Sequence, residues 1–278
     1  MSVVRVSSED AIARFARSEK ACGTLRRWKS DPRRSRVVPL VLAHQNTVLA
    51  SVTPDDVKEV AVSTEHALGA VRKRDVIRIP RIRDWNPDAA FTHVLSFIAE
   101  DLGRLPTYQA FRNAAEGLRF RQMLWEPAQM EIEYVVDQGV GRQQARDAMR
   151  WRIGNAYYSF LREAYVIAEL RSRRLDVRSH PLADALFHVD CWVGDVNIEL
   201  YIGNRHFRAG GIGRKTASSE LLSDAEPQFR TLQVELPVSR EFGRVHFPDN
   251  AALDRVAMQL RGEGVIDAPS NCIRSPSL

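Results

Sequence analysis

The sequence predicts a protein of the α/β (α+β) class, with an N-terminal mixed region, a helical middle and a C-terminal mixed sheet flanked by helices. Three observations support this class. Short apolar runs that suit strands occur near both ends of the chain, and helical periodicity dominates the middle. After residue 155, a helix is followed by several strands and a final helix, which is the order of an α/β unit.

The composition excludes several classes of protein. With 278 residues, 44% of them hydrophobic, the chain can bury a substantial core, which argues against disorder, collagen and coiled coil. No apolar run approaches the roughly 20 residues that cross a bilayer, and no signal peptide is recognisable, so a cytoplasmic location is predicted. Cys22, Cys191 and Cys272 are odd in number and far apart, which predicts reduced thiols.

Positive charge is concentrated at the start of the chain. Residues 1–50 contain ten Lys or Arg and four acids, whereas the whole chain carries a net charge of +5. Only five of the 40 basic residues are Lys, and Arg is the side chain suited to bidentate phosphate contacts. Genome composition produces the same bias, so both explanations remain open.

The first of three predicted regions, residues 1–85, combines strands and helices. We expect a helix over residues 8–20 capped by Ser7 or Ser8, and a second helix that begins at Thr53 and Pro54. The basic stretch 25–36 is expected to lack regular structure, as a solvated linker or as a phosphate-binding arm. Strands are predicted at 37–43 and 46–52, and an edge strand at 75–85 would present Arg78, Arg81 and Arg83.

The second region, residues 86–154, is predicted to be helical and to contain two helix-turn-helix units. In the first, a helix closes at Gly103 and the next opens at Thr107 and carries Arg112 outward. In the second, a Gly-Val-Gly turn at 139–141 precedes a helix, with a further break expected at Gly154. That helix would display three candidate nucleic-acid ligands, Arg142, Arg146 and Arg150. Either unit binds DNA or simply packs as a helical hairpin.

The third region, residues 155–278, carries the residues that suggest chemistry. Strands are predicted at 187–194, 196–202, 229–238 and 243–247, and a helix at 250–261. In 196–202, Glu199 and Tyr201 alternate with apolar residues, and a Gly194-Asp195 turn would fold this strand against the one that holds Asp190. Asp190 and Glu199 would then face the same side and could share a divalent cation.

A third acid comes from the preceding helix. Glu163 lies between Phe160, Ile167 and Leu170, whereas Glu169 falls among Arg162, Ser172 and Arg173. Glu163 is therefore the acid expected to point inward.

The order helix acid, strand Asp, strand Glu resembles the PD-(D/E)XK nuclease superfamily over about residues 155–240. The resemblance implies a restriction-endonuclease-like mixed sheet flanked by helices. It further implies that Asp190 and Glu199 hold Mg²⁺ (or Mn²⁺), that Glu163 orients the attacking water, and that the reaction is hydrolysis of DNA phosphodiesters.

The chain departs from the family pattern at one position, because Tyr201 stands where the family has Lys. Lys215, in the segment GGIGRKTAS, is the candidate replacement, or else it belongs to a solvated turn. Arg208 and Arg214, together with Lys215, could instead bind a phosphate of a substrate or effector.

Three functions therefore remain open. The first is a Mg²⁺-dependent DNA endonuclease, and the second is a non-catalytic DNA-binding or assembly protein that keeps the fold as a scaffold. The third is a protein-interaction module without a role on nucleic acid. For the DNA-acting functions, the expected partners are DNA, a second copy of the chain, or a partner subunit of a mobile-element or defence system.

Overall fold

The computed structural model describes residues 5–71, 73–76, 78–202 and 217–262. Of the structure, 58% is helical and 12% is strand, which confirms the predicted mixed α/β or α+β class. No helix in the described ranges is long and apolar enough to cross a membrane. The candidates Arg208, Arg214 and Lys215, and the thiol of Cys272, lie outside the described residues.

The N-terminal region begins as predicted with a capped helix. Ser7 caps α1 (Ser8–Phe15), and its hydroxyl accepts from the Asp10 N–H while the Asp10 carboxylate accepts from the Ser7 N–H. The next element corrects a prediction, because most of the basic stretch is helical: α2 (Glu19–Ser30) is followed by a 3₁₀ turn, η1 (Pro32–Arg34). Leu25 and Trp28 bury one face of α2, which holds the segment in a helix despite its charge.

The strands predicted at 37–43, 46–52 and 75–85 are wrong. These segments form four short helices, α3 (Val37–Leu42), α4 (Val48–Ser51), α6 (Lys73–Val76) and α7 (Pro80–Arg83). Val37 and Val41 are buried four residues apart, a helical spacing. Pro39 and Pro80 lie in first turns, where the missing N–H costs no helical hydrogen bond. In this region the described strands are the short pair β1 (Val6–Ser7) and β2 (Gln45–Asn46).

The helical region follows its predicted start and stop signals. Thr53 caps α5 (Pro54–Ser63), Gly103 closes α8 (Phe91–Leu102) in the left-handed region, and Thr107 caps α9 (Tyr108–Glu116). After α10 (Trp125–Asp137), the turn at 139–141 leads into α11 (Arg142–Ser172).

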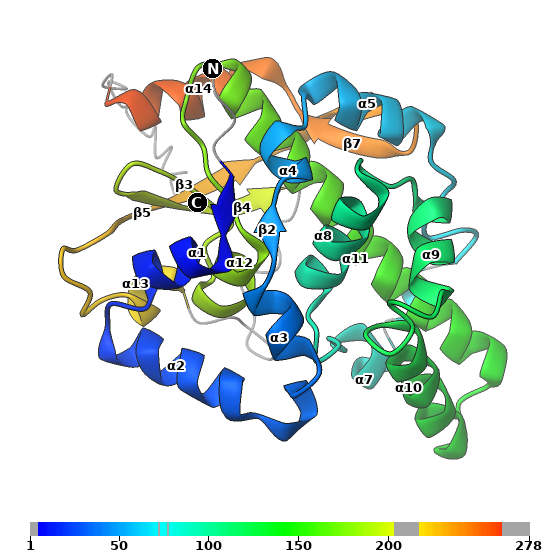
Figure 1. The fold of residues 1–278 in the computed structure, drawn as a ribbon. Coiled ribbons are helices and arrows are strands. Elements are labelled where there is room, and N and C mark those ends of the chain that lie inside the picture. Colours follow the sequence, from blue (N-terminus) through cyan, green and yellow to red (C-terminus); the bar gives the residue numbers. More distant parts are fainter. Residues whose placement is uncertain (1–4, 72, 77, 203–216, 263–278) are drawn as a thin grey trace, which may run out of the picture.

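The predicted break at Gly154 is wrong, because Gly154 lies inside α11. A Cβ atom there would come within 3.0 Å of the backbone of Ala67, so glycine allows this loop to pack directly on the helix. The boundary expected between residues 154 and 155 therefore falls in the middle of one helix. α11 crosses the molecule, with α10 packed near its start and α14 (Asn250–Arg261) near its end (Figure 1).

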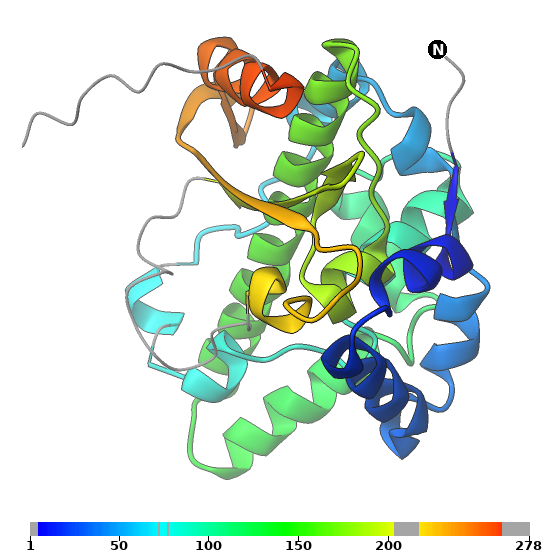
Figure 2. The same cartoon turned by 90° about the vertical axis from the view of Figure 1, so that its left-hand side faces the viewer.

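The C-terminal region contains the predicted strands and final helix. Its three-stranded sheet has the order β3 (Cys191–Val193), β4 (Val196–Ile202), β5 (Arg230–Leu236), antiparallel and then parallel. A second, two-stranded sheet pairs β6 (Val238–Phe242) with β7 (Val245–Pro248). Figure 2 shows α11 passing behind the larger sheet, and α13 (Ser218–Leu221) lying in front of it.

The strand predicted at 187–194 begins later than expected. Residues up to Phe187 belong to a helix, α12 (Pro181–Phe187), which ends at His188 in a left-handed conformation. The strand proper starts at Cys191, and Trp192 also pairs with Arg178 through two backbone hydrogen bonds of 2.8 and 2.9 Å.

Candidate functional site

The predicted β3–β4 hairpin is confirmed, and its regular pairing ends at Cys191 and Ile198. Beyond this pair the Asp190 N–H donates to the Ile198 carbonyl at 3.1 Å, which is one residue out of register, so Asp190 and Glu199 do not form a regular cross-strand pair. Both acids lie at the end of the hairpin that is remote from the Gly194-Asp195 turn.

The carboxylate of Glu199 is buried and held by three neutral donors. Its Oε1 accepts from the Ser218 N–H at 2.7 Å, and its Oε2 accepts from the Tyr201 hydroxyl at 2.9 Å and from Gln233 Nε2 at 3.0 Å. Burial acts to raise the pKa of Glu199, but these hydrogen bonds outweigh it and hold the pKa below its ordinary value. Glu199 is therefore an anion at neutral pH without a neutralising cation among the donors described.

Asp190 is held by the neighbouring strand. Its Oδ2 accepts from the Leu200 N–H at 2.6 Å, so its carboxylate lies beside the backbone of β4, one residue from Glu199. A side-chain oxygen thus satisfies a backbone N–H of β4 where β3 has not yet begun.

Tyr201 contributes a neutral donor to the site. The phenol donates to Glu199 and brings no positive charge at neutral pH. It therefore orients the acid without adding a cation.

Glu163 projects from α11 into a small cavity that neither Asp190 nor Glu199 lines. Burial raises the pKa of the Cys191 thiol, and the negative charges of Asp190 and Glu163 raise it further against the opposing charge of Arg171. Cys191 shares a face with its partner Ile198, and Glu199 alternates to the opposite face.

The described residues therefore do not gather the three predicted acids into one metal-binding group. In these ranges, no cluster of three or more His, Cys, Asp or Glu side chains is placed to hold a metal ion. A cation at the hairpin would be held by Asp190 and Glu199. Glu169, expected among arginines, does pair with Arg173 at 2.6 Å, although it is buried.

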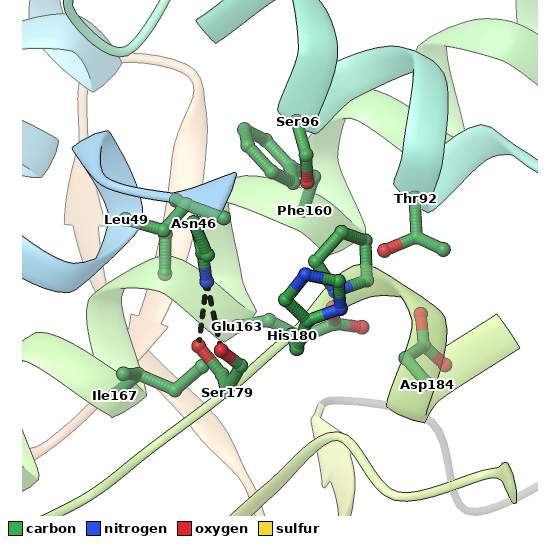
Figure 3. Close-up of a pocket in the computed structure, with 12 residues that line it drawn as sticks. Asn46, Leu49, Thr92, Ser96, Phe160, Glu163, Ile167, Ser179, His180 and Asp184 are labelled. Carbon is green, nitrogen blue, oxygen red and sulfur yellow. Dashed lines mark hydrogen bonds between the residues drawn. The ribbon is translucent and has the colours of Figure 1, made fainter. Parts of the chain in front are cut away.

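Glu163 lines a small cavity with histidine and aspartate neighbours. The cavity is about 30 Å³ in volume, enough for one or two water molecules, and His180, Asp184 and Thr92 also line it (Figure 3). Across it, Asn46 Nδ2 donates to the Ser179 carbonyl at 2.8 Å. A cavity of this size cannot admit a nucleotide.

Sequence reasoning missed a cluster of buried histidines next to this cavity. The rings of His44 and His180 lie 5.4 Å apart, and His93 stacks on Phe97, which also contacts His44. Burial lowers the pKa of His44 to about 4 and those of His93 and His180 to about 3. The three come from distant segments, so no spacing in the sequence indicates the cluster.

The three predicted arginine ligands of the second helical unit have different surroundings. Arg142 pairs with Glu133 at 2.6 Å, and Arg150 donates to the carbonyls of His66 and Ala67, both at 3.2 Å. Arg146 is exposed and lines a cavity between helices. Arg112 of the first unit pairs with Glu65 at 3.1 Å.

Comparisons of this chain with family models, with curated proteins and with solved structures found no match. The site therefore has to be interpreted from its own geometry.

The histidine cluster predicts loss of stability in acid. Histidines of the unfolded chain bind protons as the pH falls below about 6.5, whereas folded His44 does so only near pH 4. Asp10 attracts a proton to His180, and Asp184 attracts one to His93, but burial has the larger effect on the pKa of both histidines. Between pH 7 and pH 4, His44 alone should remove about 3 kcal/mol from the free energy of unfolding.

Chemical denaturation of the wild type and of His44→Gln at both pH values measures this loss. The variant should lose about 3 kcal/mol less than the wild type over this interval. An equal loss in both proteins would show that His44 is not kept neutral by burial.

Proposed function

We propose that this chain acts on DNA, and that Asp190 and Glu199 hold a Mg²⁺ (or Mn²⁺) ion used in phosphodiester hydrolysis. The observation that carries the proposal is the hydrogen bond from the Leu200 N–H to the Asp190 carboxylate, which holds that carboxylate beside β4 at the residue next to Glu199. Mg²⁺ is commonly bound by one or two carboxylates, with water and substrate phosphate completing its shell, so a two-acid site fits this ion.

The protein groups around the pair suit this role. Glu199 Oε1 accepts from the Ser218 N–H, and a carboxylate oxygen has capacity for a further interaction. The neutral donors keep Glu199 ionised and fixed in position, and the Leu200 N–H fixes one Asp190 oxygen in position. Mg²⁺, when bound, supplies a Lewis acid that offsets the charge developing on the phosphate.

The DNA contact is supported by charge on a surface of α2. Arg26, Arg27 and Lys29 are exposed on this helix, which we call the α2 basic surface. Within the described part of the chain, none of the three forms an ion pair with an acid. Their charge is therefore available to phosphates. The same proposal includes a cytoplasmic location and, as a partner, a second copy of the chain or another subunit.

A second function is favoured by the hydrogen bond from Tyr201. Because this phenol occupies Glu199 Oε2 together with Gln233, the fold could serve as a scaffold that binds DNA without cutting it. The same cleavage experiment distinguishes the two functions.

Plasmid cleavage tests the catalytic proposal. Incubation of supercoiled plasmid with the purified protein and Mg²⁺ or Mn²⁺ should give nicked circles. Asp190→Asn and Glu199→Gln preserve size and hydrogen-bonding capacity but remove the charge that holds the ion, so each should slow nicking by about 100-fold or more.

Asp195→Asn is the matched control, since Asp195 lies in the exposed turn at the other end of the same hairpin. It should nick at the wild-type rate. Plasmid that stays intact with every metal, while a gel shift persists in the wild type and in Asp190→Asn, would leave only the scaffold function.

Salt-dependent binding tests the role of the α2 basic surface. Replacing Arg26, Arg27 and Lys29 by Gln removes three charges, so the slope of log K against log salt concentration should become shallower by about 2–3. Fluorescence anisotropy with a labelled duplex measures this slope. Arg255→Gln, an exposed arginine on α14, should change it by at most about 1. An unchanged slope in the triple variant would remove α2 from the interface.

A further inference from the structure

A second cavity, far larger than the one beside Glu163, lies between α9, α10 and the first half of α11. Its volume is about 360 Å³, which falls within the range of pockets that hold small organic molecules. Most of its wall is apolar and aromatic, formed by side chains that include Tyr108, Phe111, Trp125, Ile132, Met149 and Ile153.

Three arginines line the same cavity, Arg112, Arg146 and Arg150, and the described lining contains no carboxylate. Arg112 is already neutralised by Glu65 at 3.1 Å. Within the described ranges, Arg150 donates to two backbone carbonyls and forms no ion pair with a carboxylate. For Arg146, the described part of the structure contains no hydrogen bond or ion pair within 4.0 Å.

The arginines lie near the aromatic part of the wall. Burial raises the pKa of Tyr108 to about 12, while the positive charges of Arg150 and Arg112 act on it in the opposite direction. Arg146 and Arg150 are four residues apart in α11, so both project from one face of that helix. An anion at this face could meet both groups while an attached ring enters the apolar part.

We propose that this cavity binds a small organic anion that combines an aromatic ring with one carboxylate or phosphate group. The ring would replace solvent against Trp125 and Phe111, and the anionic group would receive charge-assisted hydrogen bonds from Arg146 and Arg150. A neutral ligand would leave both guanidinium charges uncompensated, and a purely inorganic anion would leave the apolar wall unfilled. The site is separate from the Asp190–Glu199 pair and does not depend on the proposed nuclease activity.

Titration calorimetry on the full chain, with four probes, tests this proposal. Naphthoate and deoxyadenosine monophosphate each combine an aromatic ring with one anionic group. The first represents free aromatic acids and the second represents nucleotides. Naphthamide has the ring without the charge, and inorganic phosphate has the charge without the ring. At least one of the two aromatic anions should bind about 10-fold or more tightly than naphthamide and than phosphate.

Two variants locate the binding. Arg146→Gln should reduce the preference for the anion over naphthamide to about 3-fold or less. Arg142 is an exposed arginine one turn away that pairs with Glu133, so Arg142→Gln should leave this preference unchanged. Ala128→Phe should fill the cavity and abolish binding of both aromatic anions, with circular dichroism confirming that the variant is folded.

The pattern of probes decides the outcome. Binding of naphthoate assigns the cavity to aromatic acids, and binding of the nucleotide alone assigns it to nucleotides, and either supports the proposal. Equal binding of naphthamide, or a preference that survives in Arg146→Gln, overturns it, as does failure of both aromatic anions to bind.

Discussion

The antiparallel pairing of Cys191 with Ile198 is the constraint on which the site depends. Because side chains alternate along a strand, this register places Cys191 and Ile198 on one face of the sheet and Glu199 on the other. A slip of one residue would move Glu199 to the face that Ile198 now occupies. The parallel partner β5 fixes the other side of β4 and brings Gln233 opposite Glu199.

The way in which Glu199 is buried is consistent with a group kept for its charge. A buried carboxylate is costly unless it is paired, and here the compensation comes from an N–H group, a hydroxyl and an amide, none of which carries a charge. The negative charge is therefore stabilised but not cancelled. This environment suits an acid that binds a cation and also an acid with a purely structural role. Only the first requires a cation between Glu199 and Asp190.

Local signals in the sequence predicted the fold well where a capping residue or strict alternation was present, as at Thr53, Thr107 and Val196–Ile202. They failed for the apolar run 37–43, because seven apolar residues suit a strand or a buried helix equally and only a partner strand decides. The β3–β4 hairpin followed from alternation and a Gly turn, whereas the irregular hydrogen bonding at Asp190 did not. The position of Glu163 depended on which face of the sheet α11 covers, and the histidine cluster joins distant segments, so neither was accessible from local pattern.

Crystals grown with Mn²⁺ would test the central claim most directly, through the anomalous scattering of the ion. The account predicts a peak with oxygens of both Asp190 and Glu199 about 2.0–2.6 Å away, and no peak there in Asp190→Asn crystals. Absence of a peak at the hairpin in the wild type, or an unchanged peak in the variant, would contradict the account.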